Sequence, residues 1–185
     1  MNETEGPGTV EGARPQFDQT QLQYALDQIR GEQSLAMGTI AGACAALAGA
    51  GLWALITVIA KIQIGWMAVG VGFLVGAAIR KFGRGIDRVF GIVGAVLALL
   101  GCGAGNLLSV CGMIAHEENI GFFEVVSRLD PEIIQQLMVA TFSPIDLLFY
   151  GIAAYEGYRL SIRQVTEQDL TARITGHVPA GQAAP

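Results

Sequence analysis

Charged residues are scarce in this sequence. Only 15% of its 185 residues are charged, against 52% that are hydrophobic, and the mean hydropathy is +0.48. The shortage is concentrated, because residues 34–79 contain a single charged side chain, Lys61, and residues 89–115 contain none. A composition of this kind excludes an ordinary soluble domain of the same length.

Long uncharged runs predict membrane helices. A bilayer core about 30 Å thick is crossed by about 20 residues at 1.5 Å each, so an apolar run of about 18 residues or more is typical of a transmembrane helix. The runs are continuous and do not alternate with a period of two, which excludes a transmembrane barrel. The 25 glycines fit, since glycine is more frequent in membrane helices than in soluble ones. We therefore predict an all-α, polytopic membrane protein, a bundle of about four transmembrane helices with short interfacial helices.

Three further absences narrow the function. The first 33 residues contain no basic segment followed by an apolar stretch, so we predict no cleavable signal peptide. A net charge of −5, without a clustered cationic surface, excludes a nucleic-acid partner. The three cysteines, Cys44, Cys102 and Cys111, all lie in apolar runs, where they are expected to pack as buried thiols.

Composition divides the chain into four parts. Residues 1–15, rich in Gly, Pro and Glu, are predicted to be disordered. Residues 16–33 are predicted to hold a cytoplasmic amphipathic helix, lying on the membrane face or against a protein neighbour. Residues 34–161 form the membrane domain, and residues 162–185 form a polar C-terminal tail. The amphipathic helix is predicted from an apolar spacing of three and four residues, at Leu22, Ala25, Leu26 and Ile29.

Within the membrane domain the spans are predicted at residues 34–58, 64–79, 89–113 and 145–160. The fourth span is the weakest, because it covers only about 24 Å and contains Glu156. Its start is marked by Ser143, Pro144 and Asp146, at positions typical of a helix cap. Residues 120–142 carry two apolar stripes too short to cross a bilayer, and we predict interfacial helices there.

The most basic segment, RKFGRGIDR, separates the second and third spans and should determine the topology. Nine of the 11 lysines and arginines fall on one side if this loop, with four spans, shares that side with both termini. The positive-inside rule then places the loop and both termini in the cytoplasm. The topology-determining residues are Arg80, Lys81, Arg84 and Arg88.

Small residues recur at helical spacing on the first three spans. In lipid, such faces let helix backbones approach closely, which is what holds membrane helices together. One interpretation is a tightly packed bundle, and the other is that one face binds a second copy or another membrane protein. The residues of these faces are Gly38, Gly42, Ala68, Gly72, Gly76, Gly94, Gly101 and Gly105.

Among the polar residues inside the predicted spans, two are candidates for an intramembrane role, Asn106 and Glu156. Asn106 is expected to hydrogen-bond to a neighbouring helix, or alternatively to mark a polar point on a substrate or ion path. Glu156 is near the cytoplasmic end of the fourth span, where it can pair with Arg159 or reach Arg80 and Lys81. We predict no metal or cofactor site, because His116, Glu117 and Glu118 are adjacent in sequence and cannot converge on one ion.

Two segments resemble a known group of sequences. IQIGWMAVGVGFLVGAAIRKFGRGIDRVFGIVGAVLALLG (residues 62–101) and FSPIDLLFYGIAAYEGYRLS (residues 142–161) resemble an uncharacterised family of small bacterial four-helix membrane proteins. The resemblance implies a bacterial inner-membrane setting. It implies no activity, cofactor or catalytic residue.

The functional prediction is a non-catalytic integral membrane protein with an accessory or scaffold role through helix–helix association. The alternative is an oligomeric small transporter or channel whose path uses Asn106 and Glu156. An intramembrane enzyme is not expected, since Ser109 and His116 lie two turns apart on one helix. That separation, about 10 Å, is too long for a nucleophile and its base.

Overall fold

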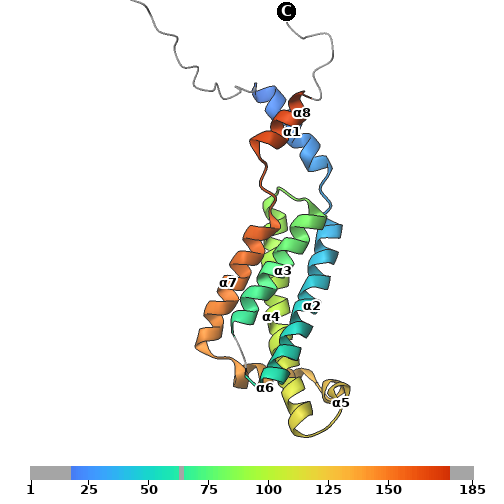
Figure 1. Ribbon diagram of the computed structural model, residues 1–185, viewed down its shortest axis with the longest axis vertical. Helices are drawn as coiled ribbons and strands as arrows, with labels where there is room; N and C mark the ends of the chain where they lie inside the picture. Colours follow the sequence, from blue (N-terminus) through green and yellow to red (C-terminus); the bar gives the residue numbers. More distant parts are fainter. Residues whose placement is uncertain (1–17, 63–64, 176–185) are drawn as a thin grey trace, which may run out of the picture. The chain divides into compact units, whose positions relative to one another are not determined.

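The apolar runs fold as helices throughout the computed structural model, which describes residues 18–62 and 65–175 (Figure 1). Within those ranges there is no strand, so the prediction of an all-α fold is confirmed. The helices are α1 (Gln19–Gly31), α2 (Leu35–Ala60), α3 (Trp66–Gly83), α4 (Arg88–Glu117), α5 (Phe122–Ser127), α6 (Pro131–Thr141), α7 (Pro144–Ser161) and α8 (Glu167–Thr175). They belong to two compact units, one containing Glu32–Gln164 and the other containing α1 and α8.

Three helices are long and apolar enough to cross a membrane: α2, α3 and α4. Their 26, 18 and 30 residues correspond to about 39, 27 and 45 Å at the standard rise. A fourth crossing requires that α6 and α7 be taken together as one broken span, with a bend of 103° between them. Several apolar helices compatible with a multi-pass membrane protein are thus present, and α7 by itself is not among those long and apolar enough to cross a membrane.

Four helices, α2, α3, α4 and α7, pack around one core in the larger unit (Figure 1). Helices α2 and α4 run parallel, because Gly38 faces Phe90 near their starts and Val58 faces Gly112 near their ends. Helix α3 contacts all three of the others, and α7 packs on α3 and α4. The core residues are Ala46, Trp53, Ala68, Val71, Val75, Ile79, Phe90, Cys102 and Ala153.

The predicted basic loop is shorter than expected. Helix α3 continues through Arg80 and Lys81 as far as Gly83, and α4 begins at Arg88, so only residues 84–87 connect them. Cations in the last turn of a helix interact favourably with its negative end, which explains why basic residues extend α3. Helix α3 therefore continues about one turn beyond residue 79, where the predicted span ends.

Short helices lie between α4 and α7. Helix α6 begins at Pro131, where the Asp130 carboxylate accepts a hydrogen bond from the Ile133 N–H at 2.7 Å. Helix α7 begins at Pro144 with the capping geometry that the sequence indicates, since the Ser143 N–H donates to the Asp146 carboxylate at 2.8 Å. Helices α5 and α6 lie within the segment 120–142, and α7 follows it.

The second unit contains a helix that we did not predict. Residues 162–185 were expected to form a polar tail, but Glu167–Thr175 form α8, and α8 packs on α1. The sequence signal for this helix is Thr166, whose N–H and hydroxyl both donate to the Asp169 carboxylate three residues further on. In α1, Ala25 and Ile29 are buried. The predictions for residues 1–15 and for the end of the tail lie outside the described residues.

Candidate functional site

The small residues of α2 and α3 are used for packing within the chain. A methyl group built at Gly42 would lie 2.7 Å from the Ile79 side chain, and one at Gly38 would lie 3.1 Å from the Gly83 Cα. On α3 the contacts are with α7: a methyl group at Gly72 would lie 2.8 Å from the Ala153 Cα. These distances are shorter than ordinary van der Waals contact. At Gly38 and Gly72 the close neighbour is backbone, so glycine allows the helices this separation, whereas at Gly42 the neighbour is the movable end of the Ile79 side chain.

Helix α4 contributes glycines to three neighbours. Gly94 lies against the Gly157 backbone of α7, while methyl groups at Gly101 and Gly105 would lie 2.8 Å from Val71 and 2.7 Å from the Trp53 ring. All eight predicted packing residues, including Ala68 and Gly76, are buried. Because contacts within one chain already occupy them, a partner would have to use other residues.

Large apolar side chains cover the outside of the bundle. Examples are Leu47, Ile59 and Leu100, which are 69%, 73% and 64% exposed, whereas the core is built mainly of small residues. In water the arrangement is usually the reverse, with large apolar residues inside. Small residues between helices and large apolar residues outside are typical of helices that pack in lipid.

Asn106 connects α4 to the short helix α6. Its side chain is 3% exposed, and its amide donates to the Thr141 hydroxyl at 3.2 Å and lies 3.9 Å from the Met138 sulfur. The Thr141 hydroxyl donates in turn to the Leu137 carbonyl at 2.7 Å. The amide therefore has a partner on a neighbouring helix, although that helix is not one of the three long apolar ones.

Glu156 is half-buried on α7, and the structure does not give it the ion pair that the sequence offered. Within residues 18–62 and 65–175, neither Arg159 nor the pair Arg80 and Lys81 forms an ion pair with it. The four basic residues Arg80, Lys81, Arg84 and Arg88 are exposed.

The turn that joins α3 to α4 is held in place by Gln33. The Gln33 side chain accepts from the Ile86 N–H at 3.0 Å and donates to the Asp87 carboxylate at 3.1 Å. Two backbone hydrogen bonds attach the same turn to the rest of the unit, Ser34 N–H to Gly83 carbonyl at 3.0 Å and Arg163 N–H to Gly85 carbonyl at 2.7 Å. The entrance of α2 and the exit of α7 thus meet at one turn.

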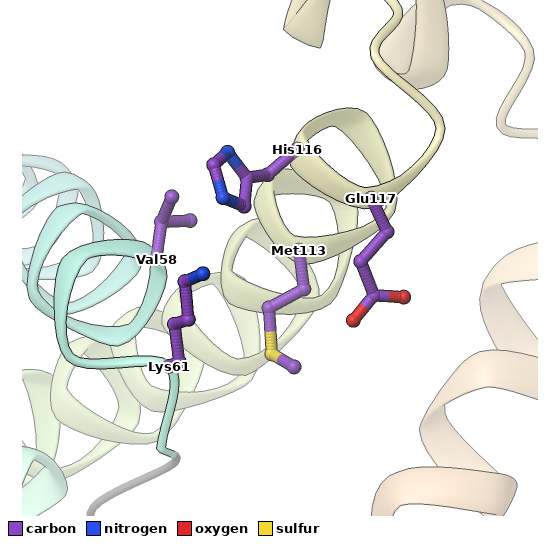
Figure 2. A pocket seen from close by; sticks show the side chains of 5 residues that line it. All are labelled: Val58, Lys61, Met113, His116 and Glu117. Atoms are coloured by element: carbon purple, nitrogen blue, oxygen red, sulfur yellow. The ribbon is translucent and has the colours of Figure 1, made fainter.

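At the opposite end of α2, a small pocket lies between α2 and α4 (Figure 2). It has a volume of about 120 Å³ and is lined by Val58, Lys61, Met113, His116 and Glu117. Figure 2 shows the Lys61 and His116 side chains pointing into the space beside Val58, while the Glu117 carboxylate lies on the far side of Met113. Lys61 has a left-handed backbone conformation, φ 55°, which ends α2 and turns its side chain toward α4.

An apolar groove lies directly beside this pocket. The groove has a volume of about 360 Å³ and runs between the same two helices, from Gly51 and Leu55 on α2 to Gly112 on α4, with Phe122 of α5 at its edge. Val58 lines both the pocket and the groove. The sequence did not predict this site, because nothing in the spacing of Lys61 and His116 shows that the two side chains meet.

The chemistry of the pocket favours an anion over a metal ion. A lysine ammonium group and an imidazole N–H are hydrogen-bond donors, and a cluster of three metal-ligating side chains does not occur in the described residues. On α2, Trp53 Nε1 and Thr57 Oγ1 are buried without a hydrogen-bond partner in the described part of the chain.

Comparison with protein-family models, with curated proteins and with solved structures found no match in any of the three. The resemblance of residues 62–101 and 142–161 to small bacterial membrane proteins stays a prediction.

Proposed function

We propose that this chain is an integral membrane protein that acts as a non-catalytic accessory or scaffold. In this proposal α2, α3 and α4 cross the bilayer and the bent pair of α6 and α7 provides a fourth crossing. The large apolar side chains on the outside of the bundle support insertion, because exposing Leu47, Ile59 and Leu100 to water would oppose folding, whereas exposing them to lipid does not. A bacterial inner membrane with both termini in the cytoplasm fits the exposed basic turn.

One observation carries the accessory role. The two ends of the chain, α1 and α8, pack on each other in a unit separate from the apolar bundle. This pairing gives the protein a small polar module in addition to its membrane anchor. Tyr24 is 47% exposed on α1, and exposed aromatic side chains are enriched where proteins bind partners.

A photo-crosslinking experiment in native membranes tests the role. A photoreactive phenylalanine at Tyr24 is expected to give one reproducible protein adduct, identified by mass spectrometry, whereas the same residue at the outward-facing Leu47 is expected to give lipid adducts. Ala25→Asp, which places a charge in the α1–α8 contact, should abolish the adduct from position 24. If position 24 gives no protein adduct, or the same proteins as position 47, the accessory role is wrong.

Helix–helix association with a second copy or a membrane partner must use the outside of the bundle. A substitution at Gly72 tests the packing of α7 and not an oligomer, because Gly72 faces Ala153 in the same chain. Gly70, by contrast, has open space at its Cβ position and lies on the outside. If association uses that face of α3, Gly70→Trp should change the oligomeric state in detergent while leaving the helical content unchanged.

Transport remains the second proposal, and one observation favours it. Trp53 and Thr57 carry buried polar atoms without partners in the described residues, and the Trp53 ring packs on Gly105, the neighbour of Asn106. Buried unpaired polar atoms of this kind often mark a water or a polar solute. A transport path along them requires that Asn106→Leu reduce solute flux in proteoliposomes. Unchanged flux would exclude the path.

A further inference from the structure

The pocket at Lys61 and His116 and the apolar groove between α2 and α4 share Val58 and form one continuous amphipathic site. The pocket supplies the Lys61 ammonium group and the His116 imidazole, and the groove supplies apolar surface that begins at the shared residue Val58. A ligand that fills both parts must have an anionic head and an apolar chain. We propose that this site binds an anionic phospholipid, with its phosphate at Lys61 and His116 and one acyl chain in the groove.

The site has the right depth for a lipid. Lys61 and His116 stand at the ends of α2 and α4, where the apolar runs stop and a membrane helix reaches the headgroup layer. The groove extends from Val58 back to Gly51 on α2, about 10 Å toward the middle of the bilayer. A chain that enters at the headgroup layer and descends along the helices is the arrangement of a phospholipid in the surrounding leaflet.

The walls of the groove favour an acyl chain over a side chain of a second copy. Gly51 and Gly112 place no side chain in the groove, and Leu55, Leu108 and Phe122 line it with apolar side chains. Its lining is almost entirely apolar, so an occupant gains nothing from polar groups below the level of Lys61. Its volume, about 360 Å³, falls within the range of small-ligand sites, about 300–1,000 Å³.

Charge determines which phospholipid is preferred. Among the described residues that line the pocket, Lys61 is the one lysine or arginine. Glu117 also lines the pocket, but its carboxylate lies on the far side of Met113 (Figure 2). A basic residue near anionic lipid contributes about 1 kcal/mol, which corresponds to about a five-fold preference. The expected ligand is therefore phosphatidylglycerol or a lipid of similar charge, with zwitterionic phosphatidylcholine bound about five-fold more weakly.

The structure offers closely matched variants for a test. Gly51→Leu fills the groove without strain, because nothing lies within 4 Å of a Cβ at this position, and Gly151→Leu makes the same change in open space on α7 as its control. Lys61→Asn removes the ammonium group and keeps a residue that tolerates a left-handed backbone. Arg128→Gln removes the charge of an arginine outside the site, which pairs with Glu124, as the control for Lys61.

The experiment is native mass spectrometry of the full chain in detergent, titrated separately with phosphatidylglycerol and phosphatidylcholine of the same acyl composition. Wild type and the two control variants should bind about five-fold more phosphatidylglycerol than phosphatidylcholine. Lys61→Asn should reduce that ratio to about one. Gly51→Leu should reduce the amount of bound phosphatidylglycerol at least as much as Lys61→Asn does. Lipid held at the exposed basic residues of the other end remains in every variant and is subtracted as the common background.

Other outcomes overturn the proposal. Equal phosphatidylglycerol binding by wild type and Gly51→Leu would show that the groove holds no acyl chain. Retention of the five-fold ratio in Lys61→Asn would show that the pocket holds no phosphate, and a dimer that Gly51→Leu dissociates would assign the groove to a second copy. The inference rests on the proposed membrane insertion, which alkaline carbonate extraction tests separately, since extraction of the chain from membranes would refute insertion whatever the lipid result.

Discussion

Gly72 and Gly70 stand two residues apart on α3, and they should respond to the same substitution with opposite signs. At Gly72 an added methyl carbon would lie 2.8 Å from the Ala153 Cα and 2.9 Å from its carbonyl carbon. Both atoms belong to the α7 backbone, so no side-chain rotation can relieve the contact and α7 must move away. At Gly70 nothing lies within 4 Å of the same carbon.

The expected magnitudes follow from these contacts. Overpacking costs about 1–3 kcal/mol, and a rigid backbone neighbour places Gly72→Ala in the upper part of that range. Replacing a helical glycine by alanine stabilises the helix by about 1 kcal/mol, because alanine has the higher helix propensity. Gly72→Ala should therefore destabilise the bundle by about 1–2 kcal/mol, while Gly70→Ala should stabilise it by up to about 1 kcal/mol.

Titration with dodecyl sulfate in mixed micelles, followed by circular dichroism, measures both changes under the same conditions. The free energies of unfolding of the two variants should differ by about 2–3 kcal/mol, with Gly72→Ala less stable than wild type and Gly70→Ala more stable. If both variants shift the midpoint in the same direction by the same amount, Gly72 does not contact α7 and the packing described here is wrong.

Three further predictions follow. Asn106→Leu and Thr141→Val should each destabilise the bundle by about 0.6–2 kcal/mol through their shared hydrogen bond, and the double variant should lose no more than the larger single loss; additive losses would refute the pairing. Gln33→Leu should release the turn at residues 84–87, so trypsin should cleave after Arg84 faster than in wild type, and an unchanged rate would mean that Gln33 does not hold the turn. Reporter fusions at the two ends of the chain should show the same cytoplasmic orientation; opposite orientations would refute the fourth crossing.

Sequence periodicity predicted most of the helices because their boundaries depend on local chemistry. The cap at Ser143, Pro144 and Asp146 uses residues within one turn, and α7 begins where they indicate. The end of α3 was misplaced because a cluster of cations was interpreted as a loop, whereas cations also suit a helix end. Helix α8 was missed because its cap, Thr166 with Asp169, lies in a segment without apolar runs.

The candidate site could not be predicted in the same way. Whether a small-residue face packs within the chain or against a partner depends on which helices become neighbours, and the 3.6-residue period is the same in both cases. The pocket at Lys61 and His116 depends on the parallel arrangement of α2 and α4 and on the left-handed backbone at Lys61. The Asn106 amide donates across helices to Thr141, which lies on a helix too short to span a bilayer, and the period does not show which helix supplies that partner.

The position of α7 has a consequence for how the protein is made. Synthesis proceeds from the N-terminus, so in the proposed membrane setting α2, α3 and α4 are present before α7 leaves the ribosome. During that interval Gly72 and Gly94 have no covering helix, because their neighbours belong to α7. The Gly85 carbonyl likewise lacks its hydrogen-bond donor, the Arg163 N–H, because residue 163 is synthesised after all the helices of the bundle. A nascent chain therefore has an uncovered, glycine-lined surface in the bilayer until α7 has been synthesised. A chain truncated before residue 144 should keep that surface uncovered and be degraded by membrane proteases.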